Sequence, residues 1–370
     1  MSTKYITKSL GIALLSGTVL MASCKTNKPE PATETFAEME QSVLNDFVSV
    51  VGNPLYAKFE NLAATLKTTV QNLANNPTDA NLAAARTAWK DVRVIWEQSE
   101  GFLIGPVDDL NYDPYMDTWP TDHNAMDNLL GSGTPITVSY LSGLDDPENA
   151  SELTLRGFHP LEYLLWGLDG SRTAASITAR EKEYMVALAE DIHNNVSALK
   201  ASWLPGSIHF GNKLVTPGTG NDVYANKREA LEALANALID ICGEVADGKM
   251  LEPFEPNADS TITESPYAHN SVNDFRNNII GARNVYTCTF DGKTGKSLSD
   301  LVRQNNSALD LEIKQKFEAG IQSFDGFTTT FEQAIYHQRP QVQNTLNALN
   351  TLKGTIGDKL VPYLTQYVKD

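Results

Sequence analysis

The chain is poor in cysteine and in basic residues. Three Cys among 370 residues exclude a disulfide-scaffold protein and a zinc site built from four cysteines. Lys and Arg number 29 against 46 Asp and Glu, a formal net charge of −17. This balance argues against a nucleic-acid partner, because phosphate binding needs a basic face. The acidity suits metal cations or basic peptides as partners.

Long apolar runs are also scarce, and the stretch that comes nearest to such a run lies close to the N-terminus. Residues 1–23 contain Lys4 and Lys8, no acid, and an apolar stretch at 10–22, which is shorter than the roughly 20 residues of a membrane-spanning helix. This arrangement is typical of a secretory signal peptide. The sequence Leu-Met-Ala-Ser-Cys then resembles a bacterial lipobox, so we predict that Cys24 is lipidated. A cleaved signal followed by an incidental Cys is the alternative.

Residues 24–34 are polar and contain two prolines, as in a flexible spacer. The two segments together predict an exported protein with a soluble body, which the lipid on Cys24 tethers to a membrane. We place it in the cell envelope, on the outer membrane, at either the periplasmic or the surface face.

Beyond the spacer, the apolar residues recur with the period of a helix. Phe36, Met39, Val43 and Phe47 form one such stripe, the mark of a helix with one buried face. Thr78 is a good cap for a following helix. Alternation with period two is nearly absent, and 136–140 is the one short candidate strand. Further helices are predicted at 179–203, 223–246, 308–324 and 341–368.

The predicted fold is therefore all-α, with two packed helical bundles of the four-helix type at 35–170 and 171–370. Together they form one unit. A long irregular segment with turn-forming Pro and Gly, 101–157, separates the early helices from the later ones. A connection of that length is unusual unless it has a function.

The most specific local pattern is Gly-x-His-x-x-Glu at residues 157–162. His159 and Glu162 stand three apart at the start of an apolar helix, so both side chains can reach one point in space. Imidazole with carboxylate suits iron, zinc or manganese. The alternative is structural: Pro160 in the first helical position would make His159 the cap and Glu162 its capping-box partner.

Two ligands are too few for a metal site, and the preceding segment offers more. Glu97, Glu100 and Asp117 could complete the ligand set, although single acidic residues in loops are more often solvated or helix caps. The oxygen-bearing residues at 109–117 resemble a calcium-binding hand in their spacing, but prolines at 114 and 120 replace its Gly and Glu, so an EF-hand is excluded. Arg93 and Arg283 are candidates to orient carboxylates or to hold an anionic ligand.

Charge is distributed unevenly around this pattern. The 62 residues between Arg93 and Arg156 contain twelve Asp or Glu and no Lys or Arg, a formal charge of −12. This segment leads directly into the helix of His159 and Glu162. A field of this sign concentrates cations and repels anions.

Several motifs in order along the chain resemble the imelysin-like family. They are AWKDVR at 88–93, EQSEGF at 97–102, Gly-Pro at 105–106, DTWP at 117–120 with Trp119, GFHPLEYLLWG at 157–167, and GARNVY at 281–286 with Arg283. The resemblance implies an all-α fold of two bundles, an extracytoplasmic location and a link to iron uptake. It also implies Arg93, Trp119 and Arg283 as supporting residues of the site. Some members of the family are classed as metallopeptidases.

The function that we expect is binding of a divalent or trivalent metal ion, iron first and zinc second, with iron-transport components as partners. A metal-dependent peptidase is the enzymatic alternative. It is disfavoured because zinc peptidases commonly use His-Glu-x-x-His, which the chain lacks. A binding module with a purely structural motif is the third possibility. Whether Cys242 and Cys288 pair is left open by the sequence.

Overall fold

The computed structural model describes residues 34–146 and 149–369. Cys24, the predicted signal peptide 1–23 and almost all of the predicted spacer 24–34 lie outside the described residues. The rest forms one compact unit, Thr35–Asp370. Among the described residues, no helix has the combination of length and hydrophobicity that crossing a membrane requires.

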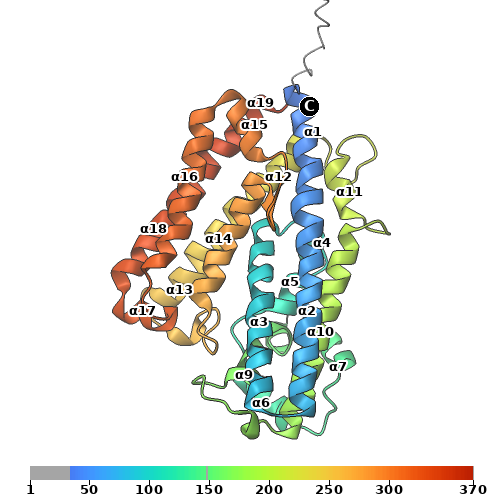
Figure 1. The fold of residues 1–370 in the computed structure, drawn as a ribbon, viewed down its shortest axis with the longest axis vertical. Coiled ribbons are helices and arrows are strands. Elements are labelled where there is room, and N and C mark those ends of the chain that lie inside the picture. Colours follow the sequence, from blue (N-terminus) through green and yellow to red (C-terminus); the bar gives the residue numbers. More distant parts are fainter. Residues whose placement is uncertain (1–33, 147–148, 370) are drawn as a thin grey trace, which may run out of the picture. The chain divides into compact units, whose positions relative to one another are not determined.

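The described chain is almost entirely helical, which confirms the all-α prediction. In Figure 1, α1 (Phe36–Asp46) and α2 (Asn53–Asn75) run on as one long helix through the π-helical turn η1 (Phe47–Gly52). Helix α3 (Asp79–Ser99) begins after Thr78, whose side chain accepts a hydrogen bond from the amide of Asn81. Both α3 and α10 (Ala179–Trp203) pack along α2.

The later helices α12 (Lys227–Gly243), α14 (Ser271–Thr287), α16 (Ser307–Ser323) and α18 (Arg339–Thr355) pack on one another. Helix α14 also packs on α3 and so joins the early helices to the late ones. Helix α10 follows residue 170, the predicted boundary between the two bundles, and it packs on α2.

Residues 101–157, expected to be a long irregular segment, contain a series of short helices. They are α4 (Pro106–Asp109), α5 (Tyr112–Asp117), α6 (His123–Gly131), α7 (Val138–Ser142) and α8 (Ala150–Leu153). The prediction of a short strand at 136–140 is wrong. Thr137 instead caps α7, because its side chain accepts a hydrogen bond from the amide of Tyr140. Helices of one or two turns are too short to show a helical period in the sequence.

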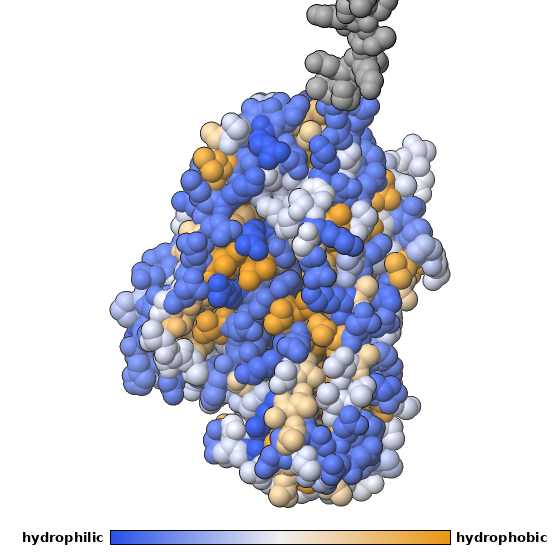
Figure 2. Space-filling view, in the orientation of Figure 1, coloured by the Kyte–Doolittle hydropathy of each residue, from blue (hydrophilic) through white to orange (hydrophobic). Residues whose placement is uncertain are grey.

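The remaining elements connect these helices. They are α9 (Phe158–Trp166), α11 (Phe210–Val215), α13 (Leu251–Phe254), α15 (Leu298–Asn305), α17 (Phe331–His337), α19 (Val361–Tyr367), the 3₁₀ turns η2 (Glu100–Phe102), η3 (Ala174–Ser176), η5 (Ser260–Ile262) and η6 (Phe324–Gly326), the π-helical turns η4 (Glu244–Met250) and η7 (Ile356–Leu360), and the antiparallel hairpin β1 (Thr289–Phe290) and β2 (Lys293–Thr294). Cys242 and Cys288 are buried and free. The face shown in Figure 2 is mostly hydrophilic, with apolar patches near its middle.

Two glycines let α14 cross the end of α3 at close range. A Cβ atom on Gly281 would lie 2.2 Å from the carbonyl oxygen of Gln98, and one on Gly101 would lie 2.6 Å from the amide nitrogen of Ala282. Neither distance is possible for a real side chain. The crossing brings Asn278 of α14 to the carboxylates at the end of α3, where its amide donates to Glu97 and Glu100.

Candidate functional site

Helix α9 carries the Gly-x-His-x-x-Glu pattern, and its start is set by Gly157. Gly157 is the N-cap, with a φ of +80°, and a Cβ atom there would stand 2.0 Å from the carbonyl oxygen of Met116. The first turn of α9 therefore lies directly against the end of α5. This contact places Asp117, the last residue of α5, beside His159.

The capping alternative for this pattern is wrong. Helix α9 begins at Phe158, so His159 is its second residue and not its cap. The Oε1 atom of Glu162 accepts hydrogen bonds from the amides of Tyr267 (3.0 Å) and Ala268 (2.7 Å) in the loop before α14. Glu162 thus fastens a distant loop to α9 and does not close back on its own helix.

His159 lies at the centre of a set of carboxylates and is fully buried. Its Nε2 atom is 3.0 Å from Oδ1 of Asp117 and 4.0 Å from Oε1 of Glu264, and its Nδ1 atom is 3.5 Å from Oε2 of Glu162. The ring packs on Trp119 with centroids 4.7 Å apart. Within the part of the chain that the structure describes, neither ring nitrogen has a partner in hydrogen-bonding alignment, and Oε2 of Glu162 has none either.

Arg93 of α3 holds the same carboxylates from the other side. Its guanidinium is buried and contacts Glu97 and Asp117, lies 2.8 Å from Oε1 of Glu264 and approaches Asp274 at 4.0 Å. A planar guanidinium can bind several carboxylates in fixed geometry. Arg93 therefore orients the oxygens that surround His159.

A cavity of about 290 Å³ leads to this cluster. Its lining is strongly acidic and includes Glu100, Asp113, Asp117, Glu244, Glu252 and Glu264. Among the described residues that line it, Lys249 of η4 is the one basic side chain. Glu244 and Glu252 are exposed and mark the mouth of the cavity, while Glu264 is buried at its inner end. The negative charge predicted from the sequence thus surrounds a path from solvent to Asp117 and Glu264, the carboxylates next to His159.

The cluster holds more carboxylates than basic groups. Its surroundings raise the pKa of some of these carboxylates and lower the pKa of another. Burial raises the pKa of Glu100 well above its ordinary value, and the nearby Glu97 adds to that effect. Burial, followed by the Asp117 charge, raises the pKa of Asp113 to about 7. Burial also opposes ionisation of Asp117, but Arg93 and then His159 outweigh it and lower the pKa of that carboxyl far below its usual range. Such a cluster takes up either protons or a cation.

Burial on its own would lower the pKa of His159, but the charge of Asp117 and the carboxylate of Glu162 raise it to about 9. A positive charge at this position is therefore favoured by the carboxylates around it. A metal ion would satisfy the same preference with the ring in its neutral form, because a ligating imidazole must be deprotonated.

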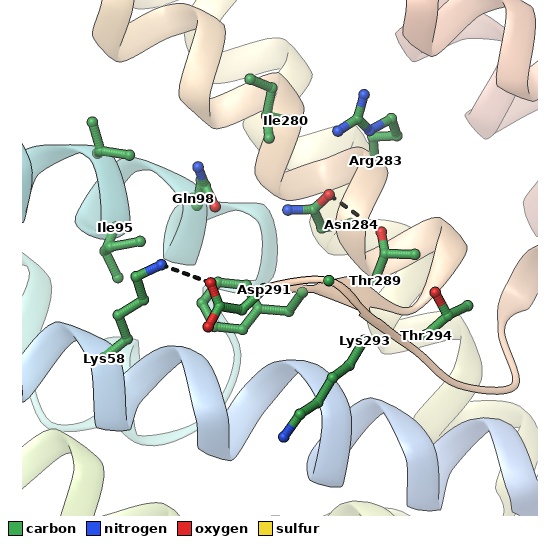
Figure 3. A pocket seen from close by; sticks show the side chains of 13 residues that line it. Lys58, Ile95, Gln98, Ile280, Arg283, Asn284, Thr289, Asp291, Lys293 and Thr294 are labelled. Carbon is green, nitrogen blue, oxygen red and sulfur yellow. Dashed lines mark hydrogen bonds and ion pairs between the residues drawn. The ribbon is translucent and has the colours of Figure 1, made fainter.

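The structure brings together most of the site residues that the sequence predicted. His159, Glu162, Asp117, Glu97, Glu100, Arg93 and Trp119 all lie in or against this one cluster. Arg283 does not: it pairs with Glu318 at 3.2 Å. It lines a separate cavity of about 440 Å³ beside the hairpin, together with Lys58 and Lys293 (Figure 3).

Sequence reasoning missed three contributors, Glu264, Lys249 and Asp274. Glu264 belongs to the loop between η5 and α14, where no helical period marks it. Lys249 lies in a π-helical turn, and Asp274 looks like an ordinary acidic residue of a first helical turn. Only the unusual density of Pro and acidic residues at 252–264 could have drawn attention to this region.

Three ligand-bearing groups are close enough to share one ion. Atoms of Asp117, His159 and Glu264 lie within 4.8 Å of one another, and so do atoms of Glu100, Asp113 and Asp117. An ion with bonds of about 2.0–2.2 Å separates adjacent ligands by roughly 3 Å, which the 3.0 Å between His159 and Asp117 matches. Glu264 would need to move inward by about 1 Å or less.

The sequence also matches known proteins. The family model described as Imelysin (Peptidase M75) matches residues 53–356. Iron-regulated protein A of Synechococcus elongatus is 27% identical over 334 residues, which cover 89% of this chain and 88% of that protein.

Solved structures share the fold. A crystal structure described as that of an iron-regulated protein A precursor from Parabacteroides distasonis superposes with a TM-score of 0.82 at 25% identity, covering 90% of this chain and 97% of that one. An imelysin-like protein from Psychrobacter arcticum superposes with a TM-score of 0.71 at 16% identity, covering 90% and 98%. The second likeness concerns the fold alone.

Proposed function

Because this chain belongs to the imelysin family, we propose that it binds a metal ion at the cluster around His159 and that it serves iron uptake. The name of the Synechococcus relative describes regulation by iron, which supports iron as the ion. In this role the ion is cargo that is bound and passed on, and not a resident cofactor.

The observation that carries the proposal is the state of His159. A fully buried imidazole normally satisfies its ring nitrogens by hydrogen bonding. Here Nε2 lies 3.0 Å from Oδ1 of Asp117 and Nδ1 lies 3.5 Å from Oε2 of Glu162, so the carboxylates hold the ring as an ion pair when it is protonated. When the ring is neutral, a ring nitrogen and a carboxylate oxygen at this separation are placed as two ligands of one ion would be.

The residues have distinct roles in this proposal. His159, Asp117 and Glu264 would hold the ion. Glu162 would hold the other ring nitrogen of His159 and so fix the direction of the imidazole, as carboxylates behind metal-bound histidines do. Trp119 would keep the ring from turning, and Arg93 would keep the carboxylates in place. A set of one imidazole and several carboxylates suits iron or manganese, and zinc less well since it prefers more nitrogen or sulfur.

The decisive experiment is a titration of the purified, metal-stripped protein with Fe²⁺ under anaerobic conditions, with Fe³⁺ chelate and with Zn²⁺. Binding by the wild type and its loss by at least about 100-fold in His159→Ala is the expected result. His337→Ala is the matched control, because His337 is exposed and far from the cluster in sequence. Equal affinities in all three proteins would contradict the proposal. Peptide hydrolysis that depends on both metal and His159 would favour the peptidase alternative instead.

The location of the protein is part of the same proposal. We propose that the lipid on Cys24 anchors the folded body in the cell envelope, where it meets imported iron and its transport partners. The substitution Cys24→Ser should release the protein from the membrane fraction after cell breakage. Continued membrane association of that variant would contradict lipidation as the sole anchor.

A further inference from the structure

Lys249 places an ammonium group inside the acidic cavity. Its Nζ atom is 3.1 Å from Glu100, 3.1 Å from Glu244, 3.6 Å from Glu264 and 3.9 Å from Glu97. The side chain is 13% exposed, so these pairs are shielded from solvent. Glu244 lies at the mouth of the cavity and Glu264 is buried at its inner end, so the ammonium lies between the exposed and the buried carboxylates.

The ammonium compensates carboxylates that would otherwise be buried without a counter-charge. Burial by itself lowers the pKa of Lys249, but Glu100 and then Glu264 and Glu244 raise it well above its ordinary value. The group is therefore a fixed positive charge. One of its partners, Glu264, is also a proposed ligand of the metal ion, so the two cations compete for the same carboxylate.

The backbone at Lys249 departs from a regular α-helix. Lys249 lies in the π-helical turn η4, directly after Gly248. Single π-helical turns inside helices are often found at functional sites. Its other partner, Glu244, has a side chain that is 42% exposed. The ammonium can therefore keep an ion pair when it leaves the inner carboxylates.

We propose that Lys249 is a built-in competitor of the metal: it neutralises the metal-free cluster, and an ion that enters through the cavity displaces it toward Glu244. This inference rests on the proposed function and adds a selectivity device to it. A divalent or trivalent ion gains two or three times as much Coulomb energy from these carboxylates as a single positive charge does. Multivalent ions are therefore expected to displace the ammonium more readily than monovalent ions do, and its return lets them bind reversibly instead of permanently.

Anaerobic Fe²⁺ titration of Lys249→Met tests the inference. Loss of the competitor should tighten binding on the order of tenfold or more and slow the transfer of Fe²⁺ to an added chelator. Lys249→Arg retains the charge and should stay close to the wild type. Lys353→Met is the matched control, because Lys353 forms an ion pair with Asp247 of the same turn but lies outside the cavity lining.

Unchanged or weaker binding by Lys249→Met, with wild-type binding intact, would overturn the inference and leave the proposed function standing. Failure of the wild type and of Lys249→Met to bind any metal would overturn both. If Lys249→Met does not fold, chemical labelling of Lys249 in the wild-type protein tests the displacement instead. Saturating Fe²⁺ should raise reductive methylation of Lys249, measured by mass spectrometry, by severalfold, and labelling that Fe²⁺ leaves unchanged would refute the displacement.

Discussion

Gly157 and the carbonyl oxygen of Met116 are in such close contact that a single added carbon atom at Gly157 would come within 2.0 Å of that oxygen. Asp117 follows Met116, and His159 lies two residues after Gly157. The contact between two backbones therefore sets the distance between an imidazole and a carboxylate that are remote in sequence. It explains why the pattern needs Gly ahead of its His, since Gly157 also has a positive φ.

The substitution Gly157→Ala should destabilise the protein by about 2–4 kcal/mol, from overpacking and left-handed backbone strain together. Urea unfolding monitored by circular dichroism measures this. Gly133→Ala is the matched control: no atom lies within 4 Å of its added Cβ, and its φ is not positive. Equal stability of the two variants would contradict the close contact.

The substitution Glu162→Gln should weaken Fe²⁺ binding by about 10- to 100-fold, because an amide holds the imidazole less strongly than a carboxylate does. Folding should survive, since Oε1 of Gln can still accept from the amides of Tyr267 and Ala268. Glu162→Ala should in addition cost about 1–3 kcal/mol for each amide left unsatisfied. Glu318→Gln, which removes an exposed charge, is the control for both measurements. Wild-type affinity in Glu162→Gln would refute the orienting role.

Arg156 and Asp191 form a buried bidentate pair at the end of the acidic segment. Both hydrogen bonds are 3.0 Å long, and the arginine also donates to the carbonyl of Leu144. Arg156→Met should lower the free energy of unfolding by about 3–5 kcal/mol, because it leaves a buried carboxylate without its partner. The double variant Arg156→Met/Asp191→Leu should recover part of that loss. No recovery in denaturant unfolding would show that the guanidinium contributes through its other contacts.

His269 and Glu332 form an ion pair at the edge of α17, 3.2 Å apart. The hydrogen bond with Glu332 raises the pKa of His269, and partial burial opposes it. A raised folded-state pKa means that the pair is fully stabilising below the ordinary histidine pKa of about 6.5 and that the contribution disappears as pH rises through the higher value. His269→Asn, chosen because φ is positive there, should therefore lower the melting temperature more at pH 6 than at pH 9. A lowering of the melting temperature that is the same at pH 6 and pH 9 would contradict the ion pair.

The sequence was sufficient to predict the long helices. The prediction at 179–203 coincides with α10, and Thr78 caps α3 as expected. These elements bury one face over many turns, so their period is readable from local sequence. The helices α4 to α8 were not predicted, because each is too short to show a helical period of its own. Helices α4, α5 and α7 pack on α10 instead, a contact that local sequence does not reveal.

The site was predicted only in part, for the same physical reason. His159 and Glu162 belong to one recognisable pattern and Asp117 to a separate motif at 117–120, and a single tight contact brings the two together. Glu264 and Lys249 reach the cluster from a loop and from a π-helical turn, and no spacing rule connects either of them with His159. Arg283 is a residue that could hold carboxylates at the site, yet its position on α14 pairs it with Glu318 instead.

The cluster draws its side chains from α3, η2, α5, α9, η4, α14 and the loop that holds Glu264. An unfolded chain therefore offers no arrangement of these groups, and the proposed metal affinity would appear only when the whole body has folded. If the chain crosses the membrane unfolded, the ion it acquires is chosen by the compartment in which folding ends. The availability of each metal ion on that side of the membrane would then decide whether the cluster carries iron, more than the cluster's own preference among metals.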